Sequence, residues 1–129
     1  MAYENCEDTM FKTLGQLLLG SIFIVGGAGT FAEPGGRVKM VEAAGVPQAR
    51  QATILNGVVM TAAGSTLAAG ILPKLSATAL LGSLTATTVV GHPFWKEENP
   101  ASRANQQIQF LKNLSLIGGL LLVLAGKND

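Results

Sequence analysis

The sequence predicts an all-α membrane protein, a bundle of four transmembrane helices with both termini on the same side of the membrane. Three observations support this fold class. Of the 129 residues, 48% are hydrophobic and only 13% are charged, and the mean hydropathy is positive. The charged residues leave four largely uncharged windows, at 13–32, 51–73, 75–95 and 107–126. Each window can cross a hydrocarbon core of about 30 Å at about 1.5 Å of rise per helical residue.

The first predicted helix spans 12–32 and follows a polar N-terminal tail at 1–11. The segment EPGG at 33–36 ends this helix, because proline and glycine interrupt a helix and turn the chain. A cleavable signal peptide is the alternative for this region. We expect a membrane helix instead, since the tail is acidic rather than basic and the apolar run is longer than a usual signal core.

The segment at 37–50 can form a short amphipathic helix on the membrane surface. Val38, Val41 and Gly45 fall on one side of such a helix, whereas its charged residues project elsewhere. A solvated loop has a similar composition, so the two alternatives stay open from the sequence.

The second and third membrane helices are predicted at 51–72 and 75–92. Only a tight turn separates them, so we expect an antiparallel hairpin. A longer polar connection then leads to the fourth helix at 107–126, where Lys112 lies near the start and can snorkel toward the headgroups. These four helices make one membrane domain over 12–129.

Glycine is frequent in the predicted spans. In lipid, helices associate through close backbone packing and modest hydrogen bonds, and small residues allow this approach. Gly57 and Gly64 are seven residues apart and share one helix face. We therefore expect a compact bundle with no room for a large internal cofactor. The glycines expected at helix contacts are Gly20, Gly27, Gly57, Gly64, Gly82, Gly118 and Gly119.

A group of polar residues near the end of the third predicted helix forms the candidate site. His92, the single histidine, can titrate, form hydrogen bonds or ligate a metal. Lys112 and Asn113 enter the next helix and can reach the same region, because the two helices are consecutive. Trp95 belongs to an aromatic segment typical of membrane interfaces. The alternative is purely structural: an interfacial histidine bonded to water or headgroups, and a lysine that snorkels.

The sequence lacks the residues of a self-contained catalytic or metal centre. It has no paired carboxylates within a span, no serine, histidine and aspartate set, no phosphate loop and no metal-spaced cluster. Cys6 is the single cysteine, which excludes an internal disulfide. A net charge of +1 offers no basic surface for nucleic acid. We predict no catalytic residue and no metal ligand, and expect the lipid bilayer and other membrane subunits as partners.

Four segments cover nearly the whole chain in order: QLLLGSIFIVGGAGTF, LNGVVMTAAGSTLAAGILPKLSATALL, GHPFW and FLKNLSLIGGLLLVLAG. This ordered set resembles the DoxX-like family of small integral membrane proteins, which is related to DoxD and, more distantly, to the Surfeit-locus cargo receptors. The resemblance implies a four-helix membrane fold and an association with redox complexes. DoxD itself looks like part of a thiosulfate:quinone oxidoreductase.

The chain also departs from the family pattern. Gln16, Thr30 and Met60 stand where the resemblance implies an arginine, a lysine and a glutamate, so independent catalysis is not expected. The resemblance implies cytoplasmic termini. The positive-inside rule favours the opposite orientation, since six of the nine lysines and arginines lie on the side away from the termini. Both orientations stay open.

Three functions follow as expectations. The first is a non-catalytic accessory subunit without a cofactor, packed into a larger redox or energy-converting assembly of a bacterial-type cell membrane or an energy-converting membrane. The alternative is a DoxD-like subunit of an oxidoreductase that binds quinone near His92, Lys112 and Trp95. The third is a small carrier or a cargo-receptor-like protein.

Overall fold

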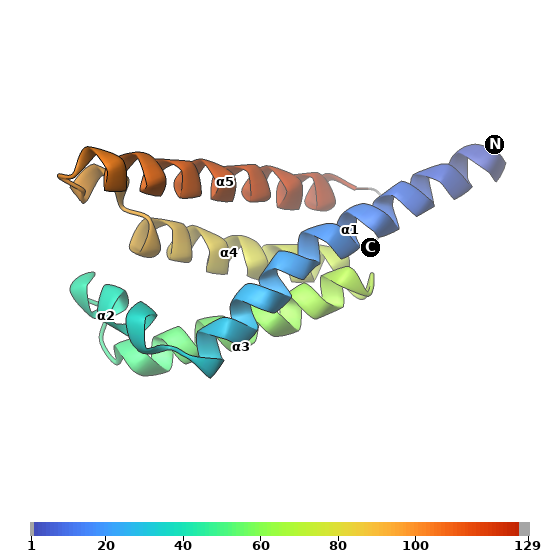
Figure 1. The fold of residues 1–129 in the computed structure, drawn as a ribbon. Helices are drawn as coiled ribbons and strands as arrows, with labels where there is room; N and C mark the ends of the chain where they lie inside the picture. Colours follow the sequence, from blue (N-terminus) through green and yellow to red (C-terminus); the bar gives the residue numbers. More distant parts are fainter. Residues whose placement is uncertain (1, 127–129) are drawn as a thin grey trace.

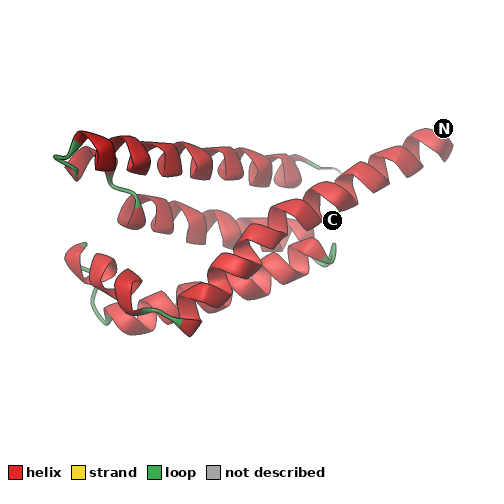
Figure 2. Cartoon of the chain, in the orientation of Figure 1, coloured by secondary structure: helices red, strands yellow, loops and turns green. Residues whose placement is uncertain are grey.

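The computed structural model describes residues 2–126, and the side chains of residues 6–126. All regular secondary structure in this part of the chain is helical, as predicted (Figures 1 and 2). The elements are α1 at Ala2–Ala32, α2 at Gly35–Ala43, α3 at Ala49–Ala68, α4 at Pro73–Gly91, the short 3-10 helix η1 at Phe94–Lys96, and α5 at Pro100–Ala125.

Two helices begin earlier than the hydropathy windows indicate. α1 already runs from Ala2, so the segment expected as a polar tail continues the helix, since nothing between Ala2 and Gly15 is a proline or glycine. α5 begins at Pro100 rather than near 107. The Asn99 side-chain oxygen accepts hydrogen bonds from the backbone N–H of Ala101 (2.9 Å) and of Ser102 (3.4 Å), which caps the helix. Polar residues therefore extend both helices beyond their apolar parts.

The segment between the first two long helices forms a helix rather than a loop. None of the α2 residues is buried. Gly45, with a φ of 84°, ends this helix, and the N–H of Val46 donates to the carbonyl of Val41. Gly70, with a φ of 72°, ends α3 in the same way. Glycine adopts this left-handed conformation without the steric cost of a Cβ.

The most extensive helix contact joins α1 to α3. A Cβ on Gly20 would lie 2.6 Å from the carbonyl oxygen of Gly64, and one on Gly27 would lie 2.7 Å from that of Gly57. The two backbones therefore touch at two levels, seven residues apart. The other glycines expected at contacts differ. Gly119 has only an ordinary contact with a leucine, and nothing lies within 4 Å of a Cβ on Gly82 or Gly118, so neither of these two packs closely against another described helix of this chain.

α3 and α4 pack as consecutive helices joined by a tight turn, and α5 lies along α4. The largest side chains that are buried completely at the centre are Phe23, Leu67, Leu80 and Leu120. Figure 1 shows α1 crossing over α3 and diverging from α5 toward the end where α2 lies. Direct contact between α1 and α5 is correspondingly sparse.

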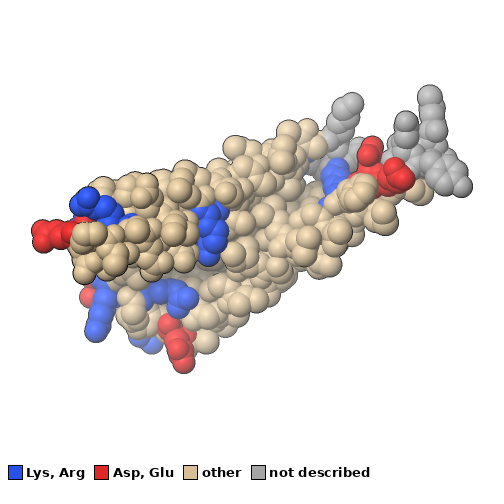
Figure 3. Space-filling view, turned by 45° about the horizontal axis from the view of Figure 1, so that its top comes forward, with Lys and Arg blue, Asp and Glu red and all other residues tan. Residues whose placement is uncertain are grey.

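The outer surface is strongly apolar. Leu122 is 76% exposed and Val25 is 74% exposed, and many other large hydrophobic side chains face outward. Figure 3 shows most charged residues near the two ends of the molecule, with a wide uncharged zone between them. Two described helices are long and apolar enough to cross a membrane, by length and composition: Cys6–Ala32 within α1, and α5.

The α1–α3 contact yields a test. Gly27→Ala places a methyl group against the Gly57 backbone, and we expect it to lower the free energy of unfolding by about 1–3 kcal/mol. The matched variant is Gly82→Ala, where open space surrounds the Cβ. It should be neutral or stabilising by about 0.5–1 kcal/mol, because alanine is the better helix former. Denaturant titration in detergent micelles, followed by circular dichroism, measures both. Equal stability of the two variants would contradict the close contact.

Candidate functional site

A pocket of about 730 Å³ lies among all five α-helices. Its apolar walls are formed by Ile22, Phe23, Met60, Leu84 and Leu116. The expectation of a bundle too compact for a large molecule was therefore wrong. The reason is geometric: α1 is held close to α3 and diverges from α5, so the space between them is not filled by side chains.

A polar cluster on one side of the pocket joins α3 to α4. The Asn56 amide donates a hydrogen bond to the Thr87 hydroxyl (3.1 Å), and its oxygen accepts one from the Ser83 hydroxyl (2.5 Å). Asn56 and Thr87 line the pocket, whereas Ser83 is buried behind them. Such bonds hold membrane helices together, because an unpaired amide is costly in hydrocarbon.

A second polar contact joins α4 to α5. The buried Asn113 amide donates to the Thr88 hydroxyl (3.0 Å), which in turn donates to the carbonyl of Leu84 (2.6 Å). In the part of the chain with described side chains, no fully buried side-chain nitrogen or oxygen lacks a partner. The side-chain amides of Asn56 and Asn113 are therefore already engaged in hydrogen bonds between helices.

His92 follows the last residue of α4 and lines the same pocket. Its Nδ1 lies 2.7 Å from the side-chain oxygen of Gln106 on α5. Because an imidazole has two ring nitrogens, this bond leaves Nε2 available for another partner. The histidine is half-buried at the helix end, so it can present this nitrogen to a ligand.

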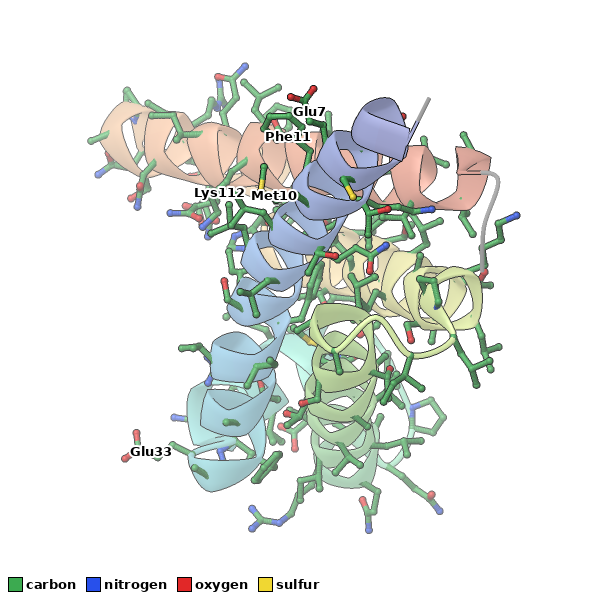
Figure 4. All side chains as sticks on the ribbon, turned by 90° about the vertical axis from the view of Figure 1, so that its right-hand side faces the viewer. Glu7, Met10, Phe11, Glu33 and Lys112 are labelled. Carbon is green, nitrogen blue, oxygen red and sulfur yellow. The ribbon has the colours of Figure 1, made fainter. Side chains whose placement is uncertain are left out.

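Two cationic side chains also line the pocket, Arg37 from α2 and Lys112 from α5. Arg37 Nη1 approaches the carbonyls of Gly29 (3.5 Å) and Glu33 (3.4 Å), both at the C-terminal end of α1. These are long contacts, supported by the negative end of the helix dipole. Lys112, labelled in Figure 4, forms neither an ion pair nor a hydrogen bond with the described residues.

Among residues 6–126, no aspartate or glutamate lines this pocket. Glu33, the acid closest to Arg37 along α1 and α2, is exposed, and Figure 4 shows its side chain pointing outward from the helices. The site therefore combines apolar walls, neutral hydrogen-bonding groups and an excess of positive charge. This combination suits an amphipathic molecule of moderate size.

The DoxX family model matches residues 11–93, from the N-terminal half of α1 to just beyond α4. The chain belongs to the DoxX family. The matched region holds most of the pocket, including Arg37, Asn56 and His92, whereas Lys112 and Asn113 lie on α5, outside the match. No curated protein and no solved structure matches the DoxX chain significantly. Family membership indicates a small membrane protein in contact with the lipid bilayer.

The structure brings together three of the four polar residues proposed from the sequence of this DoxX protein. His92, Lys112 and Asn113 line one pocket, but Trp95 does not. Trp95 is half-exposed and packs edge-on against Phe94 and Phe110, with ring centroids 5.3 and 5.9 Å away. This aromatic cluster packs η1 against Phe110 of α5.

Sequence reasoning missed several residues of the pocket. Arg37 belongs to the segment expected only at the membrane surface, and Asn56 was not among the candidate site residues, although a polar amide inside an apolar span is a usable signal. Of the three departures from the family pattern, Thr30 and Met60 line this pocket, and Gln16 lines a second one of about 520 Å³ between α1 and α5. Among the described residues, no three His, Cys, Asp or Glu side chains gather as metal ligands would.

The Asn56 cluster yields a second test. Asn56→Leu removes the bonds to Ser83 and Thr87, and we expect the free energy of unfolding to fall by about 0.6–1.7 kcal/mol, the range for interhelical bonds in membranes. Thr78→Val is the matched control, because its exposed hydroxyl bonds only to the carbonyl of Lys74 in the same helix. Unfolding in detergent micelles measures both. A loss no larger than that of the control would argue against a role for Asn56 in joining α3 and α4.

Proposed function

We propose that the chain crosses the membrane four times, through α1, α3, α4 and α5. α3 and α4 have 20 and 19 residues, or about 30 Å each, which is the thickness of a hydrocarbon core. Their exposed hydroxyl groups bond to carbonyls of their own helix, as lipid contact requires. These bonds join Ser65 to Thr61, Thr78 to Lys74 and Thr85 to Leu81.

Both termini then lie on one side of the membrane. In support, Lys12 Nζ lies only 3.5 Å from the position that a Cβ of Gly126 would occupy, so the two outer helices meet at this end. A bacterial-type cell membrane or an energy-converting membrane is the proposed location.

The proposed function is to hold a lipid-like small molecule in the inter-helix pocket, as an accessory subunit of a membrane redox assembly. The observation that carries it is the pocket itself, which combines about 730 Å³ of space with apolar walls and a polar side. The redox assembly follows from the family resemblance. A membrane subunit of this kind binds and positions the molecule, and its partners supply the chemistry.

A quinone is the second candidate for the bound molecule. Quinone carbonyls need hydrogen-bond donors, and Lys112 and Arg37 retain unused N–H groups at the pocket. His92 Nδ1 faces the Gln106 oxygen, so Nε2 of the neutral imidazole can accept a hydrogen bond from a quinol hydroxyl. In this alternative the chain is the quinone-binding subunit of an oxidoreductase, and these residues orient the head group. A carrier or cargo receptor would use the same pocket but would release the molecule across or along the membrane.

The four-span topology can be tested with single cysteines. Cys6 and Ile71→Cys should react with a membrane-impermeant maleimide from one side, and Glu42→Cys and Ser102→Cys from the other, each substitution being made in a Cys6→Ser background. Labelling in intact cells and in inverted vesicles separates the two sides. Access to Cys6 in intact cells would support the orientation given by the charges. Labelling of Cys6 and Ile71→Cys from opposite sides would rule out four spans.

Binding in the pocket can be tested by filling it. Ala52 lines the pocket on α3, so Ala52→Trp should abolish the retention of an amphipathic molecule through purification in mild detergent. Ala79→Trp, on the exposed face of α4, should retain it as the wild type does. Mass spectrometry identifies the molecule and any partner chains. Partner chains should remain with both variants. An empty wild-type pocket that also binds no added quinone or lipid would refute the proposed function.

A further inference from the structure

The charges around the pocket do not balance. Arg37 and Lys112 contribute two positive charges, and none of the residues that line the pocket is acidic. The two cations come from α2 and α5, elements far apart in the sequence that both border this space. A positively charged cavity with apolar walls concentrates anions and disfavours cations.

Neither cation is neutralised within the described chain. Arg37 uses a single nitrogen, Nη1, in two long contacts with carbonyls, which leaves most of its five N–H donors unused. Lys112 has three donors and forms neither an ion pair nor a hydrogen bond with any residue that the structure describes. A bound anion would supply both side chains with the counter-charge that the described residues lining the pocket do not provide.

The contact of the neighbouring Asn113 shows how deep Lys112 lies along the helices. Asn113 bonds to Thr88, one turn before the end of α4, so Lys112 lies near the end of the spans where α2 and η1 are found. This is the level of lipid head groups in a bilayer. The apolar walls, formed among others by Phe23 and Leu84, continue from there into the protein.

We infer that the pocket selects an amphiphile with an oxyanion head group, a carboxylate or a phosphate, which Arg37 and Lys112 bind while the apolar tail lies along Phe23, Met60 and Leu84. The inference rests on the proposed small-molecule pocket and specifies its ligand class. Arginine binds such groups through two parallel N–H bonds, and lysine adds a point charge. The anion then links α2 to α5 across the pocket.

The test uses the full chain in nanodiscs of phosphatidylcholine, with dansyl-undecanoic acid as the probe and its methyl ester as the neutral counterpart. We expect the acid to bind about tenfold more tightly than the ester. Lys112→Met and Arg37→Gln should each remove most of this preference, chiefly by weakening the binding of the acid, and circular dichroism checks that both variants are folded. Lys112→Arg should keep the preference. Lys39→Gln, which lies on α2 but not on the pocket, should match the wild type.

The outcomes separate the inference from the proposed function. Equal binding of acid and ester, or of a neutral quinone analogue and the acid, would overturn the anionic class but leave the pocket as a small-molecule site. Absence of binding for the acid, the ester and the quinone analogue would overturn both. Competition by phosphatidylglycerol added to the nanodiscs would support a lipid phosphate as the source. If inorganic phosphate alone displaces the acid, the inference that the ligand is an amphiphile would be overturned.

Discussion

The close contact between the α1 and α3 backbones is the constraint on which the rest of the structure depends. Glycines at two levels of each helix remove the side chains that would otherwise keep the axes apart, and a Cβ on any of them would lie only 2.6–3.1 Å from a carbonyl oxygen of the partner helix. Because the contact is confined to this pair, α1 follows α3 rather than α5, and the helices separate on the opposite side. The pocket is the space that this separation leaves between the helices. A tight interface and a large cavity are therefore two results of the same packing.

Much of the helix content could be predicted from the sequence, because apolar windows of sufficient length and a breaker such as Pro34 are local signals. The early start of α5 was also readable, since Asn99 followed by Pro100 is a typical N-cap and first-turn pair. Hydropathy windows report the apolar part of a helix, which explains why the polar first turns of α1 and α5 were left out. The seven-residue spacing of Gly57 and Gly64 indicated their shared face correctly. Spacing along the sequence could not distinguish these two glycines from Gly82, which faces open space. Whether a glycine is covered depends on which neighbouring helix packs against its face.

The pocket itself could not be predicted, since it depends on the angle at which α1 crosses α3 and not on the composition of either helix. Arg37 shows the same limit. Its place in a short polar segment indicates a surface position, and only the tertiary arrangement turns α2 toward the cavity. His92, Lys112 and Asn113 are brought together because consecutive helices α4 and α5 lie side by side, which is a short-range consequence of chain order. Trp95 lies in η1, where it packs on Phe94 and Phe110 and does not line the pocket.

Thr87 and Thr88 are adjacent on α4, yet one receives an amide bond from α3 and the other from α5. Consecutive helical residues point about 100° apart, so Thr87 and Thr88 can bond to helices on two sides of α4 at the same level along its axis. In lipid, apolar ridges can slide past one another at small cost, whereas a displaced amide loses its partner. The two asparagines therefore fix the longitudinal register of three helices, much as a buried asparagine fixes the alignment of a coiled coil.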